Sequence, residues 1–286
     1  METGPLSTIR KNKIKDHLNK ENSSYQNTRL SIQLSLNGLS FCITDTVNQN
    51  LIEAKRLRFP VAINEGELKN AISNFLELHQ VLNHSYESVV VVHTNPLFNI
   101  VPLPLFNKDQ LADYVKFNTQ VLPSDEVAYD LIEHQEMAVV YIPFTSVNNY
   151  IFEHFGPFDF KHHSGLHLEE LLPIQHDQKE TACYLHLDQG ILSMTVIKEK
   201  KLLFFNQFTV HTTEDLLYFI LFSLEQLHVD LHEVQALFYG ETTAIDPYFK
   251  KAAQYIAHCT IYRPSFVQKI PEHILEHHFD MINLNA

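Results

Sequence analysis

The sequence predicts an α/β protein with two lobes, each built on the same β-β-β-α-β unit. The same order of expected elements begins near Arg29, where apolar and polar residues alternate, and again near Thr181: a hairpin, a third strand, a helix and a further strand. A structural duplication explains this repeated order. Three pairs of landmarks keep similar separations of 152, 148 and 145 residues: Gly38 and Gly190, Asn64 and Thr212, and Val89 and Val234.

The first unit begins where residues 29–36 alternate between apolar and polar side chains, which predicts a strand with one buried face. Asn37-Gly38 is typical of a tight hairpin turn. Asn64 and Glu67 have the spacing of a capping box, which predicts a helix start. The other expected elements of this unit are strands over 39–43 and 51–59, a helix from 64 to about 82 and a central strand over 89–92.

The segment after the first unit completes the first lobe. Its apolar, proline-containing stretch 97–106 predicts a loop that either packs on its own lobe or binds a partner. Further along we expect a helix over 107–121, a hairpin of strands 126–134 and 137–142, a helix over 143–155, a strand over 158–160 and a helix over 165–172.

The second unit repeats the order from Thr181. Thr212 caps a helix that is apolar nearly all round as far as Leu227, so we expect this helix to be buried. Asp246 and Pro247 are the residue types of an N-cap and a first helical position. The other expected elements are strands over 181–187, 191–197, 202–210 and 234–239, a helix from 246 to about 258 and a short strand over 259–262.

These elements divide the chain into four regions. We expect a disordered N-terminal tail over 1–28, lobe I over 29–178, lobe II over 179–265 and a C-terminal helix over 266–286.

Charge and cysteine content exclude several classes of protein. The net charge of −13 disfavours broad binding to nucleic acids or anionic membranes, since either needs a cationic surface. Cys42, Cys183 and Cys259 are far apart, so neither a disulfide framework nor a zinc finger is expected. Reduced thiols, and the lack of a signal peptide or membrane span, predict a cytoplasmic protein.

Glycine is scarce, and this excludes the common phosphate-binding loops. The chain has seven glycines in 286 residues, and the closest two are nine positions apart. A Walker loop or a dinucleotide-binding loop needs clustered glycines so that backbone N–H groups can approach a phosphate.

The doubled unit resembles the actin-like ATPase superfold of sugar kinases, heat-shock chaperones and actin, which is ribonuclease H-like (the ASKHA superfamily). From about Arg29 to Pro264 the chain is also similar to an uncharacterised Bacteroidota family, a domain of unknown function, through the strand near Arg29, residues 206–208 and residues 238–240. That family is thought to share the superfold and has no assigned activity.

The resemblance implies an ATP site built from three turns, and each turn departs from the usual pattern. In the first hairpin, Leu36 and Leu39 replace the carboxylate and the hydroxyl of Asp-x-Gly-Thr/Ser. The second hairpin keeps Asp188, but Ile191 and Leu192 stand where the backbone would approach phosphate.

In the third turn, Glu241 places an anion beside a single glycine. We therefore expect no ATPase activity, no catalytic residue and no cofactor, because phosphoryl transfer depends on positioning and charge stabilisation. The remnant of the nucleotide cleft would consist of Asn37, Gly38, Asp188, Gln189, Gly190, Gly240 and Glu241.

Histidines and acids outside this cleft suggest other chemistry less strongly. His163 and His167 have helical metal-pair spacing but, with His162, are interpreted as polar surface. His273 to His277 matches H-x-x-E-H without room for a later ligand, and we expect no bound metal. Cys183 and His186 are predicted to point to opposite faces of one strand, so we expect Cys183 to pack in the core. The acidic residues Asp125, Glu126 and Asp130 are interpreted as the surface of a helix or hairpin.

The function favoured by these observations is a non-catalytic cytosolic scaffold or adaptor that binds a protein partner. The alternative is a nucleotide- or small-molecule-binding switch, or an enzyme, that uses the cleft between the lobes. A homo-oligomer is a third possibility, since actin-like proteins often polymerise.

Overall fold

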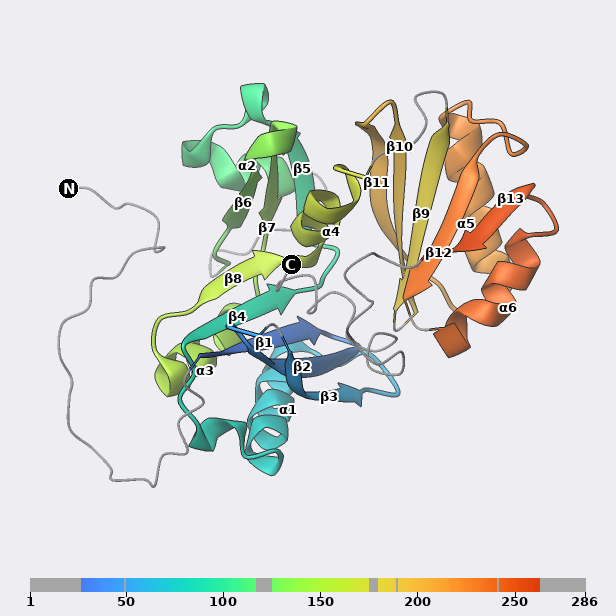
Figure 1. The fold of residues 1–286 in the computed structure, drawn as a ribbon. Coiled ribbons are helices and arrows are strands. Elements are labelled where there is room, and N and C mark those ends of the chain that lie inside the picture. Colours follow the sequence, from blue (N-terminus) through green and yellow to red (C-terminus); the bar gives the residue numbers. More distant parts are fainter. Residues whose placement is uncertain are drawn as a thin grey trace. The chain divides into compact units, whose positions relative to one another are not determined.

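The computed structural model describes residues 27–48, 50–116, 125–174, 180–188, 190–240 and 242–262 (Figure 1). Within these residues the chain forms two compact units. Unit 1 contains 27–131 and 138–163, and unit 2 contains 132–137 and 164–262. The expected C-terminal helix and nearly all of the expected N-terminal tail lie outside the described residues.

Unit 1 is built on a five-stranded sheet. The first three strands in sequence lie side by side, and the fourth lies between the first strand and the last one. β1 pairs with β2 antiparallel and with β4 parallel. The spatial order is β3-β2-β1-β4-β8. The strands are β1 (Thr28–Ser35), β2 (Gly38–Asp45), β3 (Leu51–Arg58), β4 (Ser88–His93) and β8 (Asp159–His162).

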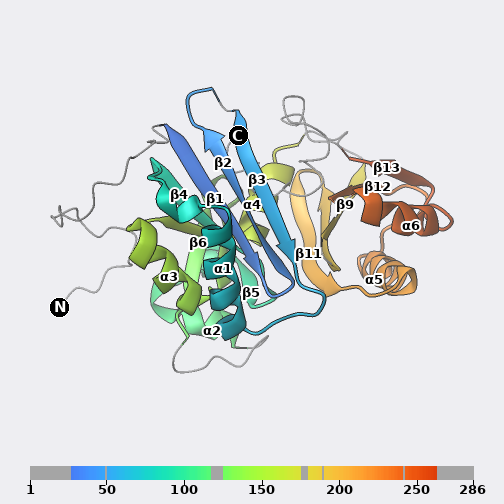
Figure 2. The same cartoon turned by 90° about the horizontal axis from the view of Figure 1, so that it is seen from below.

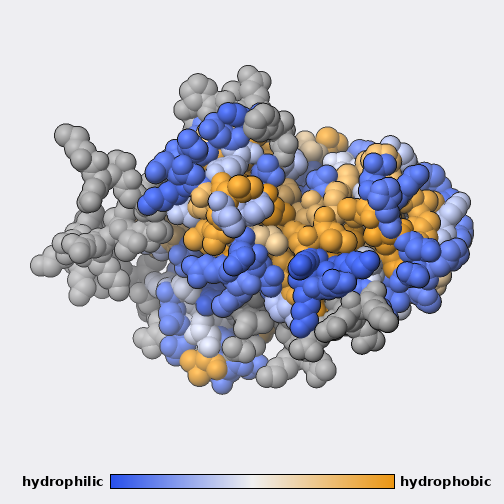
Figure 3. Space-filling view, turned by 90° about the horizontal axis from the view of Figure 1, so that it is seen from above, coloured by the Kyte–Doolittle hydropathy of each residue, from blue (hydrophilic) through white to orange (hydrophobic). Residues whose placement is uncertain are grey.

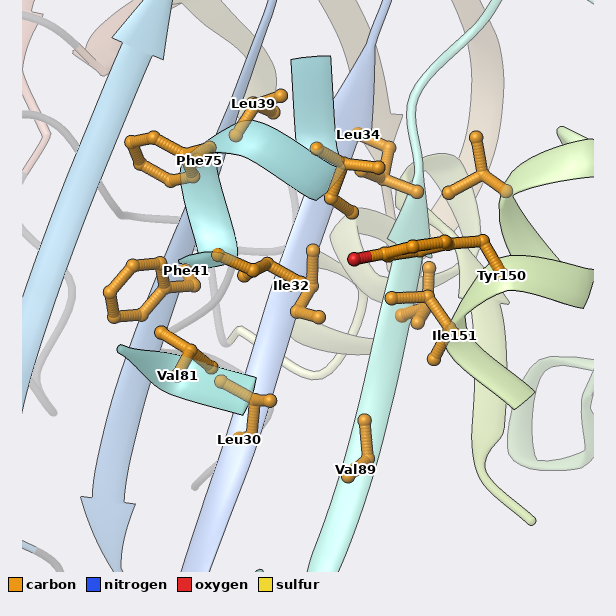
Figure 4. Close-up of a cluster of buried hydrophobic side chains, with 14 of the residues drawn as sticks. Leu30, Ile32, Leu34, Leu39, Phe41, Phe75, Val81, Val89, Tyr150 and Ile151 are labelled. Atoms are coloured by element: carbon orange, nitrogen blue, oxygen red, sulfur yellow. The ribbon is translucent and has the colours of Figure 1, made fainter. Parts of the chain in front are cut away.

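Two helices, α1 (Glu65–Leu78) and α3 (Thr145–Phe155), cover one face of this sheet. Figure 4 shows the apolar side chains of β1 and β2, such as Ile32 and Phe41, pointing toward Phe75 of α1 and Ile151 of α3. The alternation of apolar residues along the strands supplies one side of this core.

The expected capping box at the start of α1 is present. Asn64 accepts a hydrogen bond from the Glu67 N–H, and the Glu67 carboxylate accepts one from the Asn64 N–H. The helix ends before residue 82, because Gln80 adopts the left-handed conformation and a short 3₁₀ turn, Val81–Asn83, follows.

A smaller three-stranded sheet has the order β5-β7-β6 and contains β5 (Phe98–Pro102), β6 (Ala128–Ile132) and β7 (Met137–Tyr141). The prediction of a loop over 97–106 is therefore wrong for its first half. Pro96 precedes β5 and Pro102 ends it, so the prolines lie at the strand boundaries, where a missing N–H is tolerated. The expected hairpin of β6 and β7 is confirmed.

The expected helix over 107–121 is short where it is described. It consists of the 3₁₀ turn Lys108–Gln110 and α2 (Leu111–Val115), and residues 117–124 lie outside the described residues.

Unit 2 repeats the topology of unit 1. Its sheet has the order β11-β10-β9-β12-β13, which matches the first sheet strand for strand. This match confirms the duplicated β-β-β-α-β unit. The strands are β9 (Thr181–Asp188), β10 (Ile191–Lys198), β11 (Lys201–Thr209), β12 (Gln235–Gly240) and β13 (His258–Ile261).

Helices α5 (Thr213–Gln226) and α6 (Thr242–Ala252) accompany this sheet in unit 2 (Figure 2). Residues of both helices share one apolar core with the strand residues Leu185, Leu192 and Phe238. Thr212 and Asp215 form a capping box at the start of α5, as Asn64 and Glu67 do for α1.

Two predictions for these helices are wrong. α5 is not buried all round, because Tyr218 and Phe222 are 60% and 48% exposed. α6 begins at Thr242, so Asp246 is not its N-cap and Pro247 lies inside it. Pro247 is in the second turn, where it removes one helical hydrogen bond. The helix ends at Ala252, and a turn follows it.

Two properties of the described residues bear on location. None of the helices has both the length and the apolar character that crossing a membrane requires. The thiols of Cys42, Cys183 and Cys259 are all free. Cys42 and Cys183 are buried, and Cys259 is partly exposed.

Candidate functional site

The register of the two hairpins identifies which turn residues are equivalent. Ser35 pairs with Gly38 across the first hairpin, and Asp188 pairs with Ile191 across the second. Each loop therefore has two residues, and Asn37 rather than Gly38 corresponds to Gly190. The sequence comparison of Gly38 with Gly190 is one residue out of register, and Ser35, not Leu36, corresponds to Asp188.

The first turn is closed by hydrogen bonds within unit 1. The Asn37 N–H donates to the Ser35 hydroxyl (3.2 Å), and that hydroxyl donates to the Gly38 carbonyl (3.0 Å). The Asn37 carbonyl accepts from the Phe59 N–H at 2.9 Å. Gly38 is the first residue of β2.

Three of the residues expected at the nucleotide cleft lie close together in unit 2. Gly240 pairs with Leu187 where β9 and β12 run parallel. Gly240 therefore lies beside the end of β9, whose last residue is Asp188 and which leads into the turn at Gly190. Asp188 is partly exposed. Gln189 and Glu241 lie outside the described residues.

Both glycines have positive φ, 74° at Gly190 and 108° at Gly240. A Cβ on Gly240 would collide with the Leu187 carbonyl oxygen and lie 3.0 Å from the His186 ring. A Cβ on Gly190 would lie 3.2 Å from the Val210 carbonyl oxygen. Backbone and ring contacts within unit 2 therefore account for glycine at both positions.

Two apolar residues of these hairpins, Leu39 and Leu192, are buried in the cores of their own units. Leu39 belongs to the core under α1 and α3, and Leu192 belongs to the core under α5 and α6. Both side chains therefore contribute to the packing of their own units.

A cluster of histidine and tyrosine side chains lies on the other face of β9. His186 contacts His167 of α4 (His163–Leu171), with ring centroids 4.7 Å apart. The Tyr239 hydroxyl lies 3.1 Å from His167 Nδ1. The nitrogens of His163, His167 and His186 lie within 4.8 Å of one another, and all three residues are buried.

These positions correct one prediction and confirm another. His162, His163 and His167 were expected on a polar surface, but all are buried. The His162 ring packs against Phe98 and Tyr141, and the His167 ring packs against His186 and Tyr239. Cys183 packs in the apolar core, and His186, three residues later, lies on the opposite face of β9.

Tyr184 and Tyr262 extend this cluster, with ring centroids 5.1 Å apart. Burial raises the pKa of both hydroxyls, and the charge of Glu170 on α4 raises each further. Glu170 is therefore near both tyrosines.

Unit 1 has a separate buried polar cluster at the ends of β4 and β8. His93 Nε2 lies 3.0 Å from the Asn148 Oδ1, and His93 Nδ1 accepts from the Phe144 N–H at 3.3 Å. An amide oxygen only accepts, so Nε2 carries the proton and the ring is neutral. Burial lowers the pKa of His93 to about 3, although the Asn148 bond opposes this shift.

Asp130, expected on the surface of a helix or hairpin, is partly exposed on the hairpin strand β6 and joins the same cluster. Its carboxylate accepts from the His162 backbone N–H (2.6 Å) and from the Tyr141 hydroxyl (3.2 Å). Burial raises the pKa of Tyr141, and the nearby charge of Asp130 raises it further. The sequence signal that could have found His93 is a histidine directly after the apolar run 89–92.

Solved structures with the same architecture define the class of fold. A Bacteroides thetaiotaomicron protein of actin-like ATPase fold and unknown function is 20% identical, with a TM-score of 0.78 over 91% of this chain and 95% of that one. A chain of the PilM-PilN type IV pilus biogenesis complex is 13% identical, with a TM-score of 0.55 over 90% and 96%. The protein therefore has the actin-like ATPase fold, as the sequence predicted.

The family is also clear. The model of the family described as "Protein of unknown function (DUF3822)" matches residues 16–259, and the chain belongs to that family. No curated protein matches the sequence.

Proposed function

We propose that this protein is a non-catalytic cytoplasmic scaffold or adaptor that binds a protein partner. The observation that carries the non-catalytic part is the hydrogen bonding of the first turn. A phosphate-binding hairpin offers backbone N–H groups to its ligand, whereas the Asn37 N–H donates to Ser35. Ser35, the counterpart of Asp188, has no charge with which to organise a metal ion.

The glycines of unit 2 support the same proposal. Gly190 and Gly240 have contacts within their own unit that demand glycine, so their presence does not require a nucleotide. The turns are then retained for folding, and we interpret their residues as remnants of nucleotide-binding motifs: Asn37 and Gly38 in the first turn, Asp188, Gln189 and Gly190 in the second, and Gly240 and Glu241 in the third.

Isothermal titration with ATP and Mg²⁺ tests the loss of nucleotide binding. We expect no heat of binding at micromolar protein and millimolar ATP. Binding with a micromolar Kd that Asp188→Asn weakens would instead support the alternative, a nucleotide-dependent switch.

The surface we propose for the partner is the exposed side of α5. Tyr218 and Phe222 are one helical turn apart, and their rings stack with centroids 5.7 Å apart. Hydrophobic residues reach the molecular surface among hydrophilic ones (Figure 3). Adjacent exposed aromatic side chains are typical anchors of protein interfaces.

Affinity capture from the native organism, followed by mass spectrometry, tests this surface with a matched control. The partner should be captured by the wild type, lost with Tyr218→Ser/Phe222→Ser, and kept with Leu78→Ser, which removes an exposed apolar side chain from α1. Equal capture by all three proteins would place the partner elsewhere. Light scattering of the purified chain at several concentrations tests whether the partner is a second copy.

The PilM-PilN structure shows that a protein of this fold takes part in a pilus biogenesis complex. At 13% identity the likeness concerns the fold alone, so we do not transfer that partner.

A further inference from the structure

We infer that His163, His167 and His186 bind one divalent transition-metal ion, with Zn²⁺ as the expected ion. This proposal does not depend on the partner or on the nucleotide site. Their ligand nitrogens lie within 4.8 Å of one another. The three residues are 2%, 0% and 2% exposed, so little solvent competes for the site.

Two of the ligands share one face of a single helix. His163 and His167 are the first and fifth residues of α4, and a separation of four residues places side chains one above the other. The third comes from β9, whose alternation turns His186 toward α4 and away from the apolar core. His163 is the first residue of α4, so the helix itself holds His163 one turn from His167.

The donor set determines the class of ion. Neutral imidazole suits Zn²⁺, Cu²⁺ and Ni²⁺, and three histidines with one open position form a known type of zinc site. Zn–N bonds of about 2.1 Å place two nitrogens of a tetrahedral site about 3.4 Å apart. The histidines, at up to 4.8 Å, therefore need only to move inward by small rotations.

A hydrogen bond to Tyr239 orients one ligand. The Tyr239 hydroxyl contacts His167 Nδ1, so His167 would bind the metal through its other ring nitrogen, Nε2. In the metal-bound form Nδ1–H would donate to the tyrosine oxygen, as metal-binding histidines usually donate their second nitrogen to a neighbouring group.

Gly240 gives His186 its space. The His186 ring atoms Cδ2 and Nε2 lie 3.0 and 3.2 Å from the position of a Cβ at residue 240. Any larger residue would displace the ring. A glycine that resembles part of an adenosine-binding turn would on this view serve the histidine site.

A carboxylate near the site offsets part of the ion's charge. Glu170 lies on α4 three residues after His167, on the same side of the helix. A buried dication is less costly beside an anion than in a wholly apolar region.

The test measures metal in protein made without a histidine tag. After incubation with Zn²⁺ and gel filtration, we expect about one zinc per wild-type chain by elemental analysis, and Co²⁺ should give the visible absorption bands of a tetrahedral site. His167→Gln and His186→Gln should each lower the zinc content at least tenfold while circular dichroism shows that they remain folded.

Two controls separate this site from other histidines. His232→Gln removes an exposed histidine of unit 2, and His273→Gln/His277→Gln removes the H-x-x-E-H histidines. Both should retain the metal. Zinc should also raise the Tm of the wild type and not that of His186→Gln. A folded wild type that takes up no zinc, or loss of zinc only in the His273/His277 variant, would overturn the proposal.

Discussion

The central strands β1 and β9 hold the same place in sheets of the same order, yet their second faces carry different chemistry. On the first face, Leu34 and Leu187 are equivalent, and both are buried in apolar cores. On the second face, Gln33 in unit 1 corresponds to His186 in unit 2, and Ser31 corresponds to Tyr184. The core face sustains the fold in both units, whereas the other face has been free to diverge.

The ends of the neighbouring strands differ in the same way. β4 ends at His93, which pairs with Leu34, and β12 ends at Gly240, which pairs with Leu187. Unit 1 therefore holds an imidazole at the position where unit 2 holds a glycine. Each unit has a buried histidine near this end of its sheet, but on different strands.

The largest expected effect comes from removing the glycine. Gly240→Ala should destabilise the protein by about 4 kcal/mol, since a Cβ there meets the Leu187 carbonyl and the backbone has positive φ. Gly156→Ala, also at positive φ but with no atom near its Cβ, should cost about 2 kcal/mol, from backbone strain alone. Urea unfolding followed by circular dichroism measures both, and equal costs would break the comparison.

The second-largest effect should come from low pH, which should lower the stability of unit 1. The unfolded chain protonates His93 below pH 6.5, but the folded chain resists until about pH 3, so stability falls as the pH drops through this window. At pH 4.5 the free energy of unfolding should be about 3 kcal/mol lower than at neutral pH because of His93 alone. Burial also lowers the pKa of His162, which acts in the same direction.

Backbone amide hydrogen exchange, corrected for intrinsic rates, measures the loss of stability at low pH separately in each unit. Protection of β4 should fall between pH 7.5 and pH 4.5, and His93→Leu should reduce that fall, whereas the exposed-site control His232→Gln should not. If His93→Leu leaves the pH dependence unchanged, another group is responsible.

The smallest effect should be the same in both units. Asn64→Ala and Thr212→Ala each remove a cap that bonds the N3 N–H, at 3.0 and 3.1 Å, and each should cost about 1 kcal/mol. Unfolding midpoints of the two variants measure this. A cost confined to one of them would show that the two capping boxes are not equivalent.

The sequence predicted the duplicated architecture because local signals for it are strong. Alternation identified β1, the capping box at Asn64 located α1, and Thr212 with the acidic residues after it located α5. β5 was missed because its prolines were interpreted as stiffening a loop. The start of α6 was misplaced because Asp246-Pro247 has the residue types of a helix start.

The candidate site could be predicted only in part. The residues around Asp188 and Gly240 were chosen by resemblance, and pairing of β9 with β12 brings those two positions together. His167 and His186 are nineteen residues apart in sequence, and only packing of α4 on the second face of β9 brings their rings together. No local pattern contains that contact.

The unequal burial of the three thiols has a practical consequence. Burial raises the pKa of Cys42 to about 12, and that of Cys259, on the edge strand β13, to about 11. Only Cys259 has partial access to solvent, so a maleimide dye applied briefly to the native protein should attach mainly there. The natural sequence thus supplies a fluorescent reporter position in unit 2, without any engineered cysteine.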